Sequence, residues 1–166
     1  MISKSITENE ITILTGGVSM GDYDYVPSIF NKLGLQTLFD SIAIQPGRPS
    51  TFAVNGSGKF CFGLPGNPVS SFFQFELLIK PLIYRLMGHI YKPDILNLRI
   101  GADFDRKKSE KLSLFPIKIN AGGEVFHVEY HGSAHINALT GADGFIFIPK
   151  GLTHLSKGDL VNVRQI

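Results

Sequence analysis

Residues 11–34 read ITILTGGVSMGDYDYVPSIFNKLG, and the order of residue types in this stretch indicates a strand, a glycine-rich loop and a helix. The apolar and β-branched residues 11–14 are typical of a buried strand. Pro27 falls in the first turn of the expected helix, Asp24 is of a type that caps helices, and Gly34 is of a type that ends them. A strand followed in this way by a helix is typical of an α/β domain.

The same alternation continues downstream. A strand is expected within residues 35–44, and NGSG at residues 55–58 joins two further strands into a hairpin. The helical segment 69–88 is apolar on most faces and should be buried, while Pro81 should kink or split it. We therefore expect residues 1–90 to form part of a doubly wound α/β domain.

After residue 90 the pattern changes to short strands separated by turns. We expect residues 91–166 to form a small all-β domain that resembles a barrel. The strands are expected in ILNLRI (95–100), KLSLFPIKI (111–119), NAGGEVFHVEY (120–130), GFIFIP (144–149) and DLVNVRQI (159–166).

Composition limits the class of protein. With 43% hydrophobic and 18% charged residues among 166, the chain can bury a core, and a net charge of +2 is too small to indicate nucleic acid as a partner. The single cysteine, Cys61, cannot form an internal disulfide and is expected to be a small buried strand residue. No apolar run has the length of a membrane span or the character of a signal peptide, so a cytoplasmic location is expected.

The glycine-rich loop is the first candidate site. Glycines let backbone N–H groups approach a ligand closely, and a helix start favours an anion such as phosphate. Carboxylates oppose an anion unless a divalent cation such as Mg²⁺ bridges them, or unless one of them acts as an acid or base. The residues alone leave a plain glycine turn capped by Asp24 as an equal alternative. The candidate residues are Gly16, Gly17, Ser19, Gly21, Asp22 and Asp24.

The second candidate is the loop QPGRP at residues 45–49. Prolines fix φ and Gly47 permits a sharp bend, so Arg48 is presented from a stiff loop. A guanidinium suits phosphate or another oxyanion, although a surface arginine on a turn is the alternative. The candidate ligand-binding residues here are Pro46, Gly47 and Arg48.

The third candidate is GLPGNPVSS at residues 63–71. Ser70 and Ser71 fall in the first turn of a helix, where free N–H groups are expected. A strand–helix connection punctuated by prolines is the alternative. All three loops follow the expected ends of strands, where ligands bind in open α/β sheets. The candidate residues are Pro65, Gly66, Asn67, Pro68 and Ser70.

HVEYH at residues 127–131 has a spacing that could hold a metal on a strand. The pattern H-x-E-x-H places His127, Glu129 and His131 on one face and apolar residues on the other. We favour a solvated face of an amphipathic strand over a metal site.

Taken together and in order, three stretches resemble the C-terminal half of the molybdopterin molybdenumtransferase family, which includes MoeA and the gephyrin E domain. They are TGGVSMGDYDYV (15–26), IQPGRPSTFAV (44–54) and FGLPGNPVSSFFQFELLIKPLIYRLMG (62–88). Residues 132–151 and 155–163 resemble the family's C-terminal β-barrel domain.

The resemblance implies an enzyme of molybdenum cofactor biosynthesis. Such an enzyme transfers molybdate into adenylylated molybdopterin with release of AMP, is assisted by Mg²⁺, and works as a homodimer without nucleic acid or membrane partners. This chain would be a C-terminal piece of it, because the family's N-terminal domains and the first half of the α/β domain are missing. Activity of the piece alone is therefore not implied.

The resemblance also assigns roles to residues. Asp22 and Asp24 match acidic positions of the family's ligand loop and would be catalytic and hold Mg²⁺, and Arg48 stands where the family usually has lysine. Two other readings remain: a non-catalytic pterin- or nucleotide-binding or scaffold module, and an enzyme similar to competence-damage-type nucleotide pyrophosphatases.

Overall fold

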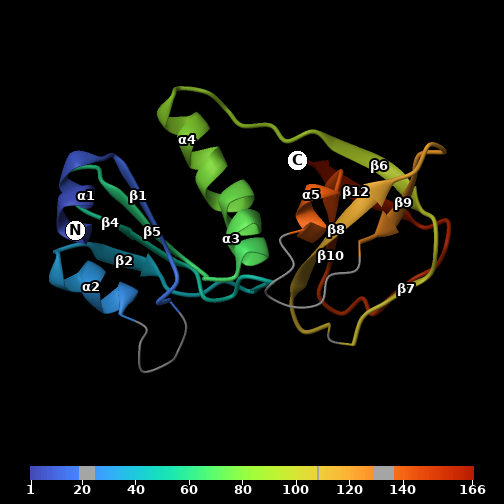
Figure 1. Cartoon of the computed structure of the whole chain (residues 1–166), viewed down its shortest axis with the longest axis horizontal. Helices are drawn as coiled ribbons and strands as arrows, with labels where there is room; N and C mark the ends of the chain where they lie inside the picture. Colours follow the sequence, from blue (N-terminus) through green and yellow to red (C-terminus); the bar gives the residue numbers. More distant parts are fainter. Residues whose placement is uncertain (19–24, 108, 129–136) are drawn as a thin grey trace. The chain divides into compact units, whose positions relative to one another are not determined.

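The computed structural model of the 166-residue chain (Figure 1) divides into two compact units, each with its own sheet and its own buried core. The first unit comprises residues 1–43 and 47–75, and the second comprises residues 44–46 and 76–166. The boundary between the two units falls between Phe75 and Glu76, whereas the sequence pattern changes from α/β to all-β near residue 90. The structure describes residues 1–18, 25–107, 109–128 and 137–166.

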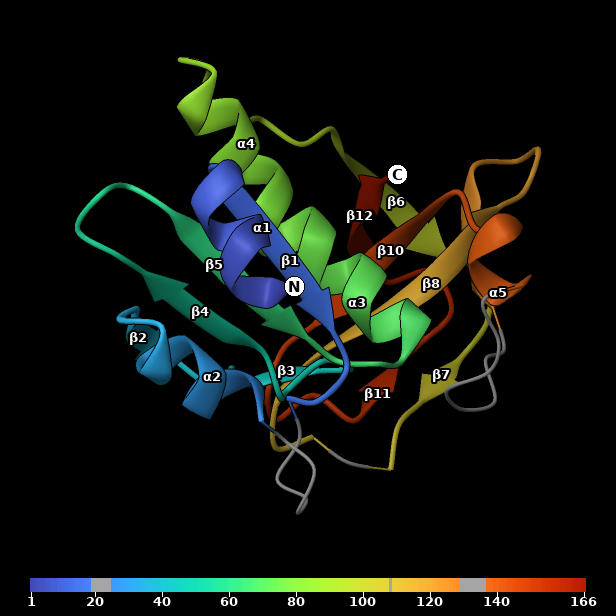
Figure 2. The same ribbon diagram turned by 60° about the vertical axis from the view of Figure 1, so that its left-hand side comes forward.

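The first unit is built on a four-stranded sheet in the order β1-β5-β4-β2. The four strands are labelled in Figure 2. Its strands are β1 (Ile11–Thr15), β2 (Gln36–Phe39), β4 (Thr51–Val54) and β5 (Phe60–Leu64). The neighbours β1 and β5 are parallel, while β4 is antiparallel to both β5 and β2. The predicted hairpin is confirmed, with the Asn55 N–H donating to the Lys59 carbonyl at 3.2 Å.

Helices α1 (Ile2–Glu8) and α2 (Val26–Lys32) pack on the sheet and share one buried cluster with its central strands. Phe30, Ala53 and Cys61 are fully buried there, which confirms the expectation for the cysteine. As predicted, Pro27 lies in the first turn of α2. The residue at the cap position is Tyr25, without a side-chain hydrogen bond, and Asp24 lies outside the described residues.

The long helical segment comprises α3 (Pro68–Gln74), the π-helical turn η1 (Phe75–Ile79) and α4 (Lys80–Leu86). Pro81 sits in the first turn of α4, directly after the π-helical turn. Because proline donates no hydrogen bond and its ring crowds the preceding turn, the wider π turn accommodates it. The helical run continues without a break from α3 through η1 into α4, so the irregularity at Pro81 is a π-helical turn and not a split. The expected burial holds for parts of α3 and η1 and is wrong for α4, which has no buried residue. No helix among the described residues has both the length and the apolar character needed to cross a membrane.

The second unit is a closed five-stranded barrel in the order β10-β12-β6-β9-β8, with β8 pairing back to β10. Each of the five predicted segments contains one of its strands, so the expected barrel is confirmed. Outside the ring, β3 (Ile44–Gln45) joins β8 in parallel, β7 (Phe104–Asp105) pairs with β11 (His154–Leu155), and α5 spans Asn137–Thr140. The ring strands are β6 (Ile95–Ile100), β8 (Leu112–Ile119), β9 (Glu124–His127), β10 (Gly144–Ile148) and β12 (Leu160–Gln165).

Candidate functional site

The first and third candidate loops meet at the carboxyl ends of β1 and β5. The Gly16 N–H donates to the Leu64 carbonyl at 2.9 Å, and a Cβ on Gly66 would stand 3.5 Å from the Gly16 Cα. Gly16 and Gly17 adopt φ of 88° and 65°, which other L-residues rarely adopt. Gly17 and Gly66 are exposed, so backbone from both loops faces solvent at one edge of the sheet.

The remainder of the glycine-rich loop, with Ser19, Gly21, Asp22 and Asp24, lies outside the described residues. Its base is closed by the Val26 N–H, which donates to the Gly17 carbonyl at 3.1 Å. Across the described part of the chain, no group of three or more His, Cys, Asp or Glu side chains could hold a metal ion. Asp22 and Asp24 lie outside those residues, so magnesium at these two positions stays a prediction.

The QPGRP loop reaches the same edge in an unexpected way. The strand before it, β3, belongs to the barrel sheet, so Gln45 and Pro46 belong to the second unit. The loop instead enters the first unit's sheet through β4, whose first residue, Thr51, pairs with Gly63 near the end of β5. Because β4 runs antiparallel to β5, the start of β4 lies beside the end of β5. Gly47 and Arg48 reach this edge by preceding β4, whereas the sequence predicts that they follow a strand of this sheet.

Gly47 is the tightly held residue of this loop, whereas Arg48 is exposed. Gly47 has φ of 113°, and its carbonyl accepts a hydrogen bond from the Ser50 Oγ at 2.8 Å. The fully buried side chain of Gln74, from α3, packs directly against it. No motif in the sequence marks Gln74, and the one local signal is a lone amide among phenylalanines on an apolar helix.

The Pro-Gly-Asn-Pro bend corrects one expectation. The first turn of α3 has few free N–H groups, because the Asn67 Oδ1 accepts from Val69 N at 3.0 Å and from Ser70 N at 3.4 Å. The Ser71 N–H donates to the Asn67 carbonyl at 2.9 Å. Ser70 is 4% exposed, so its side chain is buried. Asn67 therefore acts as the helix cap, and the exposed groups of the bend are Gly66 and Pro68.

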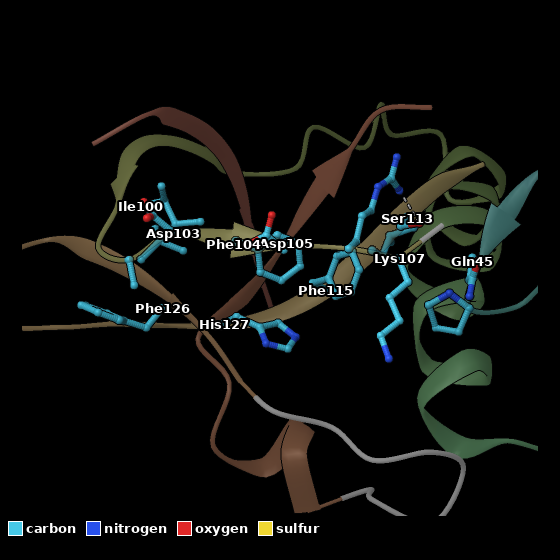
Figure 3. Close-up of a pocket in the computed structure, with 15 residues that line it drawn as sticks. Gln45, Ile100, Asp103, Phe104, Asp105, Lys107, Ser113, Phe115, Phe126 and His127 are labelled. Atoms are coloured by element: carbon cyan, nitrogen blue, oxygen red, sulfur yellow. Dashed lines mark hydrogen bonds between the residues drawn. The ribbon is translucent and has the colours of Figure 1, made fainter. Parts of the chain in front are cut away.

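The second unit contains a pocket of about 880 Å³, which sequence analysis did not identify (Figure 3). Its walls come from β7, β8, β9 and the segments that flank them, together with Gln45 and Pro46 of the second candidate loop. No local motif marks this pocket, because its residues come together only when the barrel closes.

One wall of the pocket contains His127, where the expectation of a solvated strand face is wrong. The His127 ring is half-buried and lies 5.1 Å from the ring centroid of Phe104 and 5.4 Å from that of Phe115. Its neighbour Val125 is fully buried, while Phe126 is 36% exposed and lies against Gly101. Closure of the barrel turns the face with Val125 and His127 inward. Glu129 and His131 lie outside the described residues.

Arg106 is a buried residue among those that line the pocket. Its guanidinium donates to the Lys111 carbonyl at 3.1 Å, to the Ser113 Oγ at 2.6 Å, and to the carbonyls of Leu152 and Pro149. Burial lowers the pKa of Arg106 from its ordinary value, because the charged form loses hydration. Arg106 thus joins the segments around β7, β8 and β11.

Comparison with protein families gives two matches. Residues 1–85 match the family described as "Probable molybdopterin binding domain", and residues 99–166 match the "MoeA C-terminal region (domain IV)". The first match covers the α/β sheet and all described residues of the three candidate loops, and the second covers most of the barrel.

Relatives and solved structures agree with these matches. The chain is 32% identical to a molybdopterin molybdenumtransferase of Staphylococcus epidermidis and 30% identical to one of Staphylococcus aureus, in each case over 98% of this chain and 39% of the relative. The crystal structure of a molybdopterin biosynthesis MoeA protein from Pyrococcus horikosii matches with a TM-score of 0.81 and 30% identity, over 99% of this chain and 39% of that one. A molybdenum cofactor biosynthesis protein from Pyrococcus furiosus shares the fold, with a TM-score of 0.74 and 19% identity, over 99% of this chain and 52% of that one.

The chain therefore spans about two fifths of the length of the curated relatives that it matches. With residues 1–85 matching one family model and residues 99–166 the other, the chain belongs to the molybdopterin-binding domain family and has a MoeA-type C-terminal region.

Proposed function

We propose that this chain is the C-terminal part of a molybdopterin molybdenumtransferase, which transfers molybdate into adenylylated molybdopterin and releases AMP. The names of its relatives and the description of its family model support this proposal. We further propose that the complete enzyme acts as a homodimer in the cytoplasm.

The observation that carries the proposal is the meeting of Gly16, Leu64 and Gly66 at one edge of the sheet. Two loops that are about 50 residues apart in sequence bring exposed glycine backbone together there, at the carboxyl ends of two parallel strands. This is where open α/β sheets bind ligands, and glycines allow a phosphate to approach the backbone closely.

In this proposal the N–H groups and the arginine of the loops bind the anionic part of the ligand, and the carboxylates bind the metal ion. Backbone N–H groups of the glycine loops and the exposed Arg48 bind phosphate oxygens of the ligand. Asp22 and Asp24 hold Mg²⁺, which prefers carboxylate oxygens, and position the reacting groups. When bound, Mg²⁺ supplies positive charge that lets two carboxylates stand beside a phosphate.

Calorimetry with adenylylated molybdopterin tests the binding part of this proposal. We expect Arg48→Gln to weaken binding about tenfold, since it removes a charge-assisted hydrogen bond. Arg85→Gln, a change at an exposed arginine of α4, is the matched control and should leave affinity unchanged. Equal affinities of the two variants would contradict the role of Arg48.

Catalysis is tested separately in the complete enzyme, by following molybdate-dependent release of AMP. We expect Asp24→Asn to abolish most of this release while binding persists. Binding without any AMP release in the parental enzyme would favour the non-catalytic binding module instead.

A further inference from the structure

The pocket of the barrel unit, with its volume of about 880 Å³, is a second candidate ligand site. Its volume lies in the range of small-molecule sites, and β-barrels commonly bind small molecules at their mouths. All residues that line it belong to the second unit. The family match that covers most of the barrel is described without a ligand.

Three aromatic rings, each from a different strand, form part of the pocket wall. The ring centroids of Phe104 and Phe115 are 4.9 Å apart, and the His127 ring lies 5.1 Å and 5.4 Å from them. All three rings are half-buried, and Figure 3 shows them close together. They offer a surface on which the flat ring of a ligand can stack.

Hydrogen-bond donors lie on the same side of the chain as these rings. Side chains alternate along residues 103–106, so Phe104 and Arg106 share one side. Phe104 contacts Phe115 of β8, and the Arg106 Nη1 donates to the Ser113 Oγ of the same strand at 2.6 Å. Ser113 precedes Phe115 by two residues, which places both side chains on one face, about 7 Å apart along β8. A ring stacked on Phe115 can therefore carry a substituent to Ser113 and Arg106.

The two carboxylates of the same segment lie on its other side. The Asp103 Oδ1 accepts a hydrogen bond from Lys157 N at 2.7 Å. The Asp105 Oδ1 lies 2.8 Å from the His154 Nδ1. Neither Lys157 nor His154 lines the pocket, so both carboxylates are bonded to partners outside it. These bonds hold the negative charges of the lining away from the donors.

The buried charge of Arg106 has no counter-charge. This residue is 9% exposed, and its four hydrogen bonds go to three backbone carbonyls and to the Ser113 Oγ. Among the described residues, no carboxylate forms an ion pair with it. Burial lowers the pKa of Arg106, as expected of a guanidinium without a carboxylate beside it. A guanidinium has five N–H groups, so one remains for an anionic ligand.

We propose that this pocket binds a small aromatic carboxylate, with its ring stacked on the three aromatic side chains and its carboxylate at Ser113 and Arg106. Arg106 is the one buried cation among the described residues that line the pocket, and it matches the single charge of a carboxylate. Lys107, an exposed residue of the lining, adds attraction for the anion. The site lies within the second unit and does not depend on the proposed function.

The test uses the 166-residue chain and 2-naphthoate, whose own fluorescence reports binding. 2-Naphthamide has nearly the same shape without the charge, and we expect it to bind at least tenfold more weakly, as for the loss of a charge-assisted hydrogen bond. Cyclohexanecarboxylate keeps the charge without the flat ring and should bind about fivefold more weakly. Equal affinities for 2-naphthoate and 2-naphthamide would overturn the proposal.

Variants of the donors locate the carboxylate. We expect Arg106→Gln to weaken 2-naphthoate binding about tenfold and Ser113→Ala about fivefold. Because Arg106 also joins three segments, Lys107→Gln tests the same charge if Arg106→Gln does not fold, with an expected loss of about threefold. Lys92→Gln, at an exposed lysine outside the pocket, is the matched control and should leave the affinity unchanged.

The stacking surface is tested by Phe115→Leu, for which we expect a loss of about fivefold in 2-naphthoate affinity. Phe52→Leu, at a half-buried ring of the first unit, is the matched control. The comparison with cyclohexanecarboxylate tests the same surface if Phe115→Leu does not fold.

Further results separate the pocket from the proposed function. The affinity for 2-naphthoate should be unchanged in Arg48→Gln. A loss in Arg48→Gln with none in Ser113→Ala and Lys107→Gln would place the carboxylate outside the pocket and overturn the inference. Displacement of 2-naphthoate by adenylylated molybdopterin would also overturn it, because the pocket would then belong to the substrate site.

Discussion

Gln74 lies so close to Gly47 that a Cβ on Gly47 would stand 2.1 Å from the Gln74 Nε2. A helix side chain that is fully buried thus fixes the backbone of a loop that the sequence singles out for ligand binding. The contact also shows why this position needs glycine, since its φ of 113° is unfavourable for any side chain.

We expect Gly47→Ala to lower the free energy of unfolding by about 2 kcal/mol, from crowding and backbone strain together. Urea denaturation measures this loss. Adding Gln74→Ala should relieve the crowding in the double variant and leave the strain. Gly56→Ala, with no atom within 4 Å of the new Cβ, serves as the control and should stay near the parental value.

Asn67 offers a prediction that separates folding from binding. Asn67→Ala removes the cap of α3 and should lower the free energy of unfolding by about 1 kcal/mol. Asn67→Asp keeps an oxygen acceptor and places a negative charge at a helix start, so stability should be retained. The same negative charge should lower the affinity for adenylylated molybdopterin measured by calorimetry, and the loss should be larger at low salt. Unchanged affinity would place the anion away from this bend.

The buried pair of Arg164 and Glu76 should matter far more to stability than an exposed pair. The Arg164 Nη2 lies 3.5 Å from the Glu76 Oε2 and donates to the Glu76 carbonyl and to the Tyr91 Oη, and both charged side chains are 7% exposed. We expect Glu76→Gln to lower the free energy of unfolding by about 3 kcal/mol, since it removes the carboxylate from the buried Arg164 and also from Lys80, whose Nζ lies 3.0 Å from the Glu76 Oε2.

The control for this pair is Glu8→Gln, which breaks the exposed pair of Lys4 and Glu8, with its 3.7 Å separation. It should change the free energy of unfolding by less than about 0.5 kcal/mol in the same denaturation experiment. Similar losses in Glu76→Gln and Glu8→Gln would show that the buried pair is not a stabilising contact.

His154 gives the pairing of β7 with β11 a dependence on pH. The hydrogen bond to Asp105 raises the pKa of His154 above its ordinary value, with further attraction from Asp103 and Asp159, against a smaller loss of hydration. Because the folded pKa is raised, this contribution to stability is fully present below the unfolded value of about 6.5 and is lost as pH rises through the folded pKa.

Asp105→Asn should return the pKa of His154 towards that of an unfolded histidine, which an NMR titration of the ring protons measures. Asp94→Asn should leave the titration of His154 unchanged, because Asp94 is not among the groups that raise it. A parental pKa in Asp105→Asn would mean that the hydrogen bond contributes nothing to the shift.

Much of the fold could be predicted from local patterns. The run before Gly16, the turn at residues 55–58 and the helical residues around Pro27 each specify their element within a few residues, and the structure agrees. The cap at Asn67 also has a local signal, because Asn before Pro is a common helix start, although the same residues resemble a ligand loop.

The remainder depended on partners far away in sequence. The two residues of β3 show no pattern that assigns them to a sheet. Only their parallel pairing with β8 makes them part of the barrel sheet, outside the closed ring. His127 and Phe126 alternate in a way that allows either face to be buried, and closure of the ring decides between them. The barrel pocket is a product of both facts, so no motif could mark it.

The pairing of Arg164 with Glu76 affects how the barrel can be isolated. A truncated barrel that begins at residue 91 would lack Glu76, and the buried guanidinium of Arg164 would lose its carboxylate. It would also lack β3, so Leu112 and Ser113 at the start of β8 would lose their parallel partner. Dissection of this protein should therefore keep residues 76–90 with the barrel.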